Sequence, residues 1–303
     1  MEAVKTVYPD IFFTEQYSEL FKDTAFGGKP CHFNFAGIDY RFYKRPIPGT
    51  PYFDIVSPYG YSGPLELEEF ADWDKYIPEF SRYCEREHII AEFARLNPFI
   101  MSWGTHYEHE IYYIDLTQPE TQIWKGFDKG CRSSLKGAGR NNLALRQETN
   151  LLDFVNLYQQ TMKRDNAKPS YYFNEPFWVK LWRLGYFISV VDEQGVIKSS
   201  GCFLVYGDYC HYFLSASTGD SVGATNLLLW EAIKWAKFQD CKIFNLGGGL
   251  KTGDSLESFK RSFSHLSKPF YTYRHIHDKK VYDELSKGIE TDFFPAYRAE
   301  RKS

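Results

Sequence analysis

The chain has 303 residues, which is enough for one large domain, or for two of about 150 residues, to bury a sizeable core. Hydrophobic residues make up 43% of it and charged residues 25%, which excludes an intrinsically disordered protein. The formal net charge of -3 argues against a surface built throughout for nucleic acid, although it permits a local basic site.

The cysteines indicate a reducing compartment. There are six, none in a C-x-x-C pair, and most have apolar neighbours, so they read as small buried hydrophobes. Neither a signal-type N-terminus nor an apolar run long enough to span a bilayer is evident. We therefore expect a cytoplasmic protein without a membrane span.

The first part of the chain alternates strand and helix patterns. β-like runs cover 30–37, 40–47 and 51–65, a helical pattern covers 67–88, and strand patterns cover 89–100 and 109–117. Pro119 disfavours continuation of regular structure. We therefore expect a first domain over residues 1–118.

The second part is more regular. A basic helix is expected over 123–141, followed by a strand (143–148), two helices (151–164, 174–185) and a strand (186–193). A hairpin turns through Gly207-Asp208, and a helix (224–239), a strand (241–248), a short helix (255–263) and a last strand (269–276) follow. From residue 143 onward the order is β-α-α-β-β-β-α-β-α-β.

The helix that begins at Ala224 has the clearest pattern. Leu229, Ile233 and Ala236 form one apolar stripe. The helix connects two strands in βαβ fashion, so these strands are expected to lie parallel, with ligand chemistry at their carboxyl ends.

The glycine-rich stretch after the next strand, FNLGGGLKTGDSLESFKRSF (244–263), is not a phosphate-binding P-loop. That motif needs G-x-x-x-x-G-K-[ST], because its lysine must reach the terminal phosphates. Counted from Gly248, Gly253 is in register, but Asp254 stands where the lysine is required. A carboxylate there would repel the phosphates.

Several stretches together resemble the Fem-type branch of the GNAT acyltransferases, the peptidoglycan-bridge aminoacyltransferases. They are SPYGYSGPL (57–65), AEFARLNPF (91–99), KGCRSSLKGAGRN (129–141), GATNLLLWEAIKWA (223–236) and FNLGGG with LESFKRSFS (244–264). The resemblance covers nearly the whole chain. It implies an α/β (α+β) fold of two tandem GNAT-like domains, with mixed central sheets flanked by helices. The second domain is expected over 119–275, and 276–303 is expected to pack back on the first, acceptor-side domain.

The resemblance implies an N-acyltransferase that joins an acyl or aminoacyl group to an amine. The strands that end near Ser217 and Gly247 should splay apart to admit the acyl donor. Glycines at such a strand end let a ligand approach the backbone, although a flexible turn before a helix is the plainer explanation. No permanently bound cofactor is expected. The co-substrate is an aminoacyl-tRNA, with a peptidoglycan precursor as acceptor, or an acyl-CoA, with an amino sugar or amino acid as acceptor.

Lys260 is the leading catalytic candidate. Through the resemblance it matches the lysine of the family's Phe-Lys pair, here Phe259-Lys260, which stabilises developing negative charge. A fixed ammonium would stabilise the tetrahedral oxyanion of acyl transfer. Without the resemblance, Lys260 reads as an exposed helix lysine. The resemblance makes Phe259 a donor-binding candidate, one that packs rather than reacts.

The remaining donor-binding candidates lie at strand ends and at a helix start. At the helix start, formed by Gly223, Ala224 and Thr225, free N–H groups and the helix dipole suit an anion. The SVGAT loop is short and lacks the leading Arg or Gln of the usual GNAT loop, which weakens coenzyme A as donor; an ordinary N-cap is the alternative. Asp220 reads as a capping residue. The donor-binding set is Gly223, Ala224, Thr225, Ser215, Gly247 and Gly248.

The acceptor-binding candidates are Tyr59, Tyr61, Arg95 and Arg132. The first three are assigned through the resemblance. Arg132 belongs to a series of basic residues spaced 4, 3, 4 and 4 apart, which forms one stripe if helical. Arginine binds phosphate bidentately, although a solvated face is the common reason for such a series. Its members are Lys125, Lys129, Arg132, Lys136 and Arg140.

Other kinds of site are not expected. His106-x-x-His109 and His275-x-His277 lack a metalloprotease frame and a third ligand at a suitable spacing, so no metal is predicted. No G-x-S-x-G nucleophile motif is present. DNA is not an expected partner, and the base that takes the amine proton is not identified. The rival class of function is a binding module that kept the fold and lost turnover.

Overall fold

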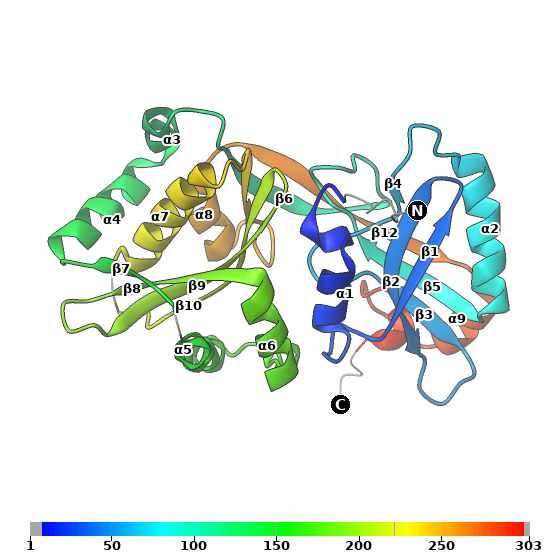
Figure 1. Cartoon of the computed structure of the whole chain (residues 1–303). Helices are drawn as coiled ribbons and strands as arrows, with labels where there is room; N and C mark the ends of the chain where they lie inside the picture. The colour runs from blue at the N-terminus through cyan, green and yellow to red at the C-terminus, as the bar shows by residue number, and fades with distance from the viewer. Residues whose placement is uncertain (1–7, 149, 221, 300–303) are drawn as a thin grey trace. The chain divides into compact units, whose positions relative to one another are not determined.

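The computed structural model describes residues 8–148, 150–220 and 222–299 and has a mixed α/β fold (Figure 1). The chain divides into two compact units. Unit 1 contains Phe12–Glu108 and the segment from Pro269 onward, whereas unit 2 contains Pro9–Ile11 and His109–Lys268. The boundaries between the units, at 108/109 and 268/269, come earlier in the chain than those expected at 118/119 and 275/276. A short N-terminal piece that includes Asp10 also belongs to unit 2, which the sequence did not indicate.

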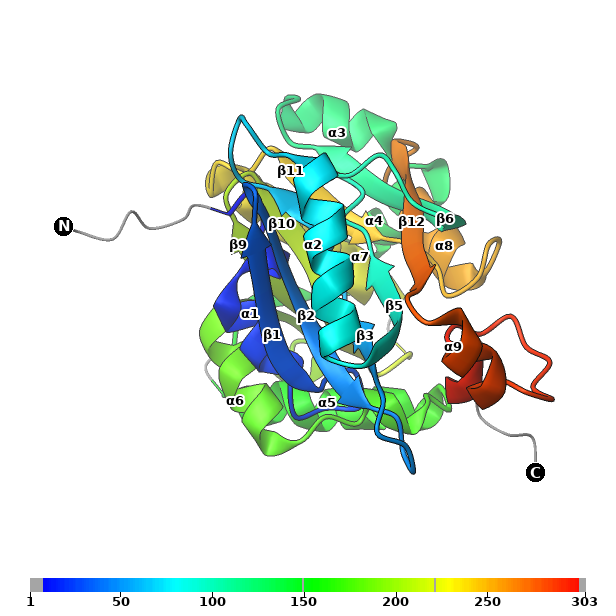
Figure 2. The same cartoon turned by 90° about the vertical axis from the view of Figure 1, so that its right-hand side faces the viewer.

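Unit 1 is a mixed sheet with helices on both faces. Its strand order is β1 (Lys29–Phe35), β2 (Ile38–Pro46), β3 (Phe53–Val56), β5 (Ile89–Arg95) and β12 (Ser267–Ile276), and the short β4 (Leu65–Glu66) pairs with β2. Only the pairing of β3 with β5 is parallel among these. Helix α2 (Trp73–Arg86) lies across the sheet (Figure 2). It packs Phe80 against Tyr40 and Phe42.

The other elements of unit 1 complete its packing. Helix α1 (Glu15–Phe21), which was not predicted, lies on the face opposite α2. Tyr43 of β2 alternates with Tyr40 and Phe42 and so points to that face, where its hydroxyl donates to the Ser18 carbonyl of α1. Helix α9 (Lys279–Leu285) packs beside β5, and beyond it Arg298 Nε donates to Asp54 Oδ2 at 2.8 Å. Helix α2 begins six residues later than the pattern suggested, since Asp72 is its N-cap and accepts from the Lys75 amide. Short 3-10 helices cover Ile11–Phe13 and Ala296–Arg298, and a third, Pro169–Tyr171, lies in unit 2.

Unit 2 contains the longer succession of strands. Their order is β6 (His106–Asp115, in this unit from His109), β11 (Ile243–Gly247), β10 (Tyr209–Ser217), β9 (Ile197–Tyr206), β8 (Gly185–Val191) and β7 (Ala144–Gln147). Helix α7 (Ala224–Phe238) packs on one face and is itself covered by α4 (Lys129–Arg140), whereas α5 (Leu151–Arg164) and α6 (Glu175–Leu184) pack on the other (Figure 1). Helix α8 (Ser255–Arg261) follows β11. The expected fold class, a mixed α/β fold with sheets flanked by helices, is confirmed.

The single basic helix expected over 123–141 is wrong. Two helices, α3 (Glu120–Gly126) and α4, replace it. The break falls at Phe127, whose backbone is extended with ψ 144° and whose ring is 2% exposed. Burying this aromatic ring against Trp230 and Phe263 favours a change of direction that helical periodicity alone does not require.

Candidate active site

Strands β10 and β11 begin as neighbours and then part. They are parallel, as expected, and pair only over Tyr209–His211 with Ile243–Asn245. Directly after the last pair, His211 with Asn245, both strands shift register against their other neighbours. On β10 the shift lies between Tyr212 and Leu214, and on β11 between Asn245 and Gly247. An extra residue bends a strand and increases its twist, so two adjacent bulges give a physical reason for the divergence.

Lys260 lies at the end of β11, on the side of the molecule where the two strands part. It belongs to α8, and its Nζ donates to the Gly248 carbonyl at 2.7 Å. The residue is partly exposed, but burial of the ammonium lowers its pKa to about 8, while the negative charge of Asp254 acts in the opposite direction. An ammonium has three N–H donors, so donors remain beyond the one given to Gly248.

Phe259 anchors α8 to the core of unit 2. It is partly buried against the cluster that includes Phe244 and Phe263, and its ring meets Phe263 edge to face at 5.4 Å. This packing directs the next residue, Lys260, toward the strand end. A direct contact of Phe259 with a donor stays a prediction.

The glycines of the NLGGG stretch allow close packing around this amine. Gly247 has φ +76°, and a Cβ there would lie 2.9 Å from Lys260 Nζ. At Gly248 a Cβ would lie 2.3 Å from Cδ2 of His109, on β6. Both positions therefore need glycine for the structure itself. Their contact with a donor stays a prediction.

Asp254 organises the loop between β11 and α8. Its Oδ1 accepts from the Glu257 amide at 2.7 Å, and its Oδ2 accepts from the amides of Leu250 and Lys251 at 2.7 and 2.9 Å. These backbone donors hold the pKa of Asp254 below its ordinary value. The residue that excludes a P-loop therefore caps α8 and restrains the loop that precedes Lys260.

The start of α7 is more enclosed than the sequence suggested. Gly223 and Ala224 are buried, and Thr225 is partly exposed. Gly223 has φ +85°, and a Cβ there would lie 2.3 Å from the Ser134 carbonyl oxygen on α4. Thr225 Oγ1 lies 3.1 Å from Ser199 Oγ. Helix α4 thus covers the first turn, and donor binding at these three residues stays a prediction.

Ser215 lies on the part of β10 that has left β11. It is partly exposed and hydrogen-bonded to Tyr212, while burial raises the pKa of the Tyr212 phenol to about 12. The strand end is held from the other side, because Ser217 accepts from Thr161 Oγ1 at 3.1 Å. Asp220 is exposed and bonds Thr218 and Lys198 rather than capping α7.

Arg132 is engaged with backbone. Its guanidinium donates to the carbonyls of Lys125 and Phe127, at the end of α3. Lys129, Lys136 and Arg140 are exposed on α4, whose opposite side buries Cys131, Leu135 and Ala138. The basic stripe therefore exists on α4, with Lys125 on the separate helix α3.

The other acceptor candidates belong to unit 1. The Tyr59 ring packs on Phe26 with centroids 4.7 Å apart, and Tyr61 meets Phe270 at 5.5 Å. The Arg95 guanidinium lies over the Phe93 ring at 4.9 Å. Their contact with an acceptor stays a prediction.

The histidines considered as metal ligands have other neighbours. His277 Nε2 lies 3.2 Å from Glu92 Oε2, and His106 Nδ1 lies 2.9 Å from Thr105 Oγ1. Within residues 8–148, 150–220 and 222–299, no three His, Cys, Asp or Glu side chains are grouped to hold a metal ion.

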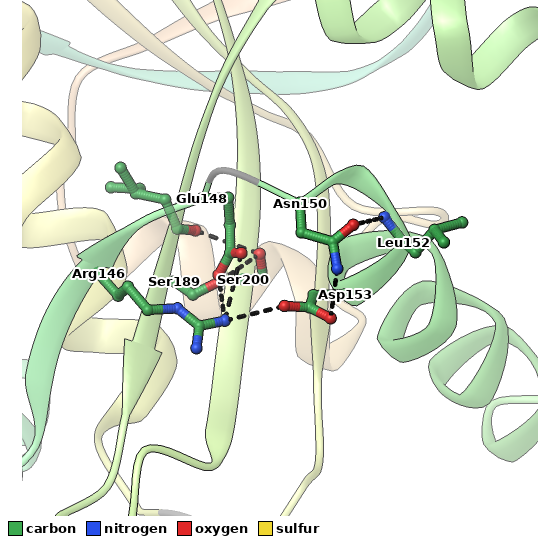
Figure 3. A network of polar contacts seen from close by, with 8 residues as sticks. Arg146, Glu148, Asn150, Leu152, Asp153, Ser189 and Ser200 are labelled. Atoms are coloured by element: carbon green, nitrogen blue, oxygen red, sulfur yellow. Dashed lines mark hydrogen bonds and ion pairs between the residues drawn. The ribbon is translucent and has the colours of Figure 1, made fainter.

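A second polar network in unit 2 involves β7, β8, β9 and α5 (Figure 3). The Glu148 side chain is 1% exposed and accepts from Arg146 at 3.0 Å, and Arg146 also contacts Asp153 at 3.4 Å. Ser189 Oγ donates to Ser200 Oγ at 2.7 Å beside it. Arg146 compensates the buried carboxylate, which would otherwise be an unpaired buried charge.

Sequence reasoning missed one group of polar side chains at the point where the strands part. His211 and Asn245 form the last pair of β10 and β11, and Asp10 contacts His211. The only signal in the sequence was a polar residue within each of two apolar strands. Asp10 is 201 residues from His211, and no local pattern connects them.

The fold resembles solved structures, whereas sequence comparison finds no relative. No protein-family model matches the chain, and no curated protein does. A crystal structure of FemX superposes with a TM-score of 0.66 at 11% identity, covering 89% of this chain and 97% of FemX.

Two further solved structures have a similar fold. The structure of L-PGS from Bacillus licheniformis has a TM-score of 0.57 at 14% identity, over 90% of this chain and 94% of that one. The C-terminal domain of a putative lysylphosphatidylglycerol synthetase from Agrobacterium fabrum has the same TM-score and identity, over 88% and 92%. These likenesses show that the chain shares its fold with FemX and with these two structures. In the described part of the chain, none of the helices has the length and apolar character needed to cross a bilayer.

Proposed function

We propose that this protein is an N-acyltransferase of the Fem-like kind, which carries an aminoacyl group from an aminoacyl-tRNA to the amine of a peptidoglycan precursor. The observation that carries the proposal is the buried Lys260 ammonium at the end of β11, beside the point where β10 and β11 part. The likeness in fold to FemX supports the choice of donor and acceptor. We place the reaction in the cytoplasm and assign it no permanent cofactor.

The proposed reaction is direct attack in a ternary complex. The acceptor amine attacks the carbonyl carbon of the ester, a C–N bond forms, and a tetrahedral oxyanion develops. Lys260 donates to that oxyanion, which collapses as the C–O bond to the tRNA ribose breaks. The attacking amine gives up one proton to solvent and the departing ribose oxygen takes one up from solvent, so an amide and a free ribose hydroxyl are formed. Positioning of the two substrates supplies much of the acceleration in such a reaction.

The decisive experiment offers isotope-labelled donors to the purified protein together with a panel of amines. We expect label to move from charged tRNA to a muropeptide amine and not from acetyl-CoA. Transfer from acetyl-CoA alone would replace the proposal with the second candidate, an N-acetyltransferase. The divergence of β10 and β11 after their short paired segment suits that candidate equally well. No transfer from either donor would favour a binding module.

The basic stripe gives an independent test of the donor. Lys129, Lys136 and Arg140 are exposed, and none has a carboxylate partner among the residues that the structure describes. Reversing all three charges to Glu should weaken binding of charged tRNA at least about tenfold and lower the salt slope by about three, while acetyl-CoA binding stays unchanged.

The matched control reverses Lys163, Lys168 and Arg183, which are exposed on the α5 and α6 side of unit 2. It makes the same change in net charge. Fluorescence anisotropy with labelled tRNA at several salt concentrations measures both variants. Equal weakening by the two triple variants would show that net charge acts, and the stripe would lose its assigned role.

A further inference from the structure

Three buried polar side chains form a hydrogen-bonded series, here called the polar series, where β10 and β11 separate. Asp10, His211 and Asn245 are 0%, 2% and 3% exposed. His211 Nε2 lies 2.9 Å from Asp10 Oδ1, and His211 Nδ1 lies 3.1 Å from Asn245 Nδ2. Buried polar groups destabilise a fold unless they are hydrogen-bonded, so these contacts make the group tolerable without yet giving it a purpose.

In the polar series each hydrogen bond is donated in the same direction, from Gly247 toward Asp10. The Gly247 amide donates to Asn245 Oδ1 at 2.8 Å, which identifies the oxygen of that side chain and turns its NH₂ group toward His211. His211 Nδ1 must therefore accept, and the imidazole proton sits on Nε2, where it is donated to Asp10. Asp10 thus selects the tautomer of His211, and His211 in turn orients the Asn245 amide.

The polar series lies next to the candidate active site. His211 and Asn245 form the last pair between β10 and β11, and both strands bulge directly afterwards. The Asn245 side chain spans the bulge of its own strand to reach the Gly247 amide. Gly247 adopts φ +76°, and the next carbonyl, that of Gly248, accepts from Lys260. A continuous series of contacts thus joins Asp10 to Lys260.

We propose that His211 and Asn245, with Asp10 behind them, are positioning residues that hold the Gly247–Gly248 bend in the conformation against which the Lys260 amine is aligned. None of the three touches the reacting atoms. They act through the bulge of β11, because a rotated Asn245 amide would release the Gly247 N–H and let the bend relax. The consequence for turnover rests on the function proposed above, whereas the consequence for Lys260 itself does not.

Two substitutions at His211 distinguish its hydrogen bond to Asp10 from its hydrogen bond to Asn245. His211→Gln places an amide N–H near the former Nε2 and keeps a donor for Asp10, but it removes the acceptor that faces Asn245. His211→Asn places a carbonyl oxygen near the former Nδ1 and keeps that acceptor, but it removes the donor to Asp10. Each variant loses one buried hydrogen bond, so a merely structural role predicts the same effect for both.

The readout independent of turnover is the reactivity of the Lys260 amine. Competitive labelling with acetic anhydride over a range of pH, quantified by mass spectrometry, measures the pKa of this one lysine. In the parent protein and in His211→Asn we expect a value near the lowered one, about 8. In His211→Gln and in Asn245→Leu we expect the pKa to move toward that of an ordinary lysine, because the relaxed bend admits water to the amine.

Turnover supplies the second readout. His211→Gln should lower kcat at least about tenfold with little change in KM, as expected when a catalytic group is misplaced, and His211→Asn should recover most of the loss. Ser189→Ala is the structural control, since it removes a buried hydrogen bond from the same sheet, between Ser189 and Ser200. It should leave the labelling of Lys260 unchanged.

The outcomes are distinct. Equal Lys260 labelling in His211→Gln, His211→Asn and the parent overturns the inference, whatever the turnover. If His211→Gln does not fold, Asn245→Leu decides by the same labelling measurement. A shift in labelling in a protein that transfers no acyl group from any donor would support the positioning role of the polar series and reject the proposed function.

Discussion

Replacing Lys260 with alanine is expected to lower kcat about 10²–10³-fold with little change in fold or in KM, which is the loss typical of removing one oxyanion donor. The ammonium lies 2.7 Å from the Gly248 carbonyl, where burial already lowers its affinity for a proton. Only the protonated form can stabilise an oxyanion. Steady-state kinetics with the donor identified by the labelling screen measure the effect, and circular dichroism checks the fold.

The pH dependence gives this prediction its sign. Because the pKa of Lys260 is lowered to about 8, the active ammonium is lost as the pH rises through that value, and kcat should fall on the alkaline side. Lys260→Arg is the matched variant, since its guanidinium stays charged throughout this range. It should lack the alkaline fall, at a lower plateau. Activity of Lys260→Ala equal to the parent would indicate that Lys260 has no chemical role.

Gly223→Ala is expected to destabilise the protein by about 2–4 kcal/mol, combining left-handed strain with overpacking. Gly223 has φ +85°, and the added Cβ would lie 2.3 Å from the Ser134 carbonyl oxygen. That oxygen belongs to the backbone of α4, so relief requires α4 to move away from α7. Chemical denaturation followed by tryptophan fluorescence measures the free energy of unfolding.

Gly139→Ala, on α4, is the control for that substitution. A Cβ at Gly139 meets nothing within 4 Å, and its φ lies outside the left-handed region. We expect this variant to stabilise the protein by about 0.5–1 kcal/mol, because alanine is the better helix former. A loss at Gly223 below about 0.5 kcal/mol would contradict the close packing of α4 on α7 that the structure shows.

The elements that could be predicted are those with a strong local pattern. The stripe of Leu229, Ile233 and Ala236 marked α7, and all three are buried. The βαβ order around it correctly predicted that β10 and β11 run parallel. Lys260 came from the resemblance rather than from any periodicity, and its catalytic role stays a prediction.

The elements that were missed depend on partners distant in the chain. The basic helix breaks at Phe127 because its ring packs against Trp230 and Phe263, more than a hundred residues later. Arg132 donates to the backbone at the end of α3, a helix end that the sequence did not reveal, and its binding of phosphate stays a prediction.

By itself, the sequence determined the periodic elements, their order and the exclusion of a P-loop, because side-chain spacing and a carboxylate at Asp254 are properties of neighbouring residues. Only the tertiary structure decided where β10 and β11 part, how deeply the Lys260 ammonium is buried, and that Asp10 reaches His211. Desolvation and buried hydrogen bonds depend on what surrounds a group in space, and here the surroundings come from segments as much as 201 residues apart.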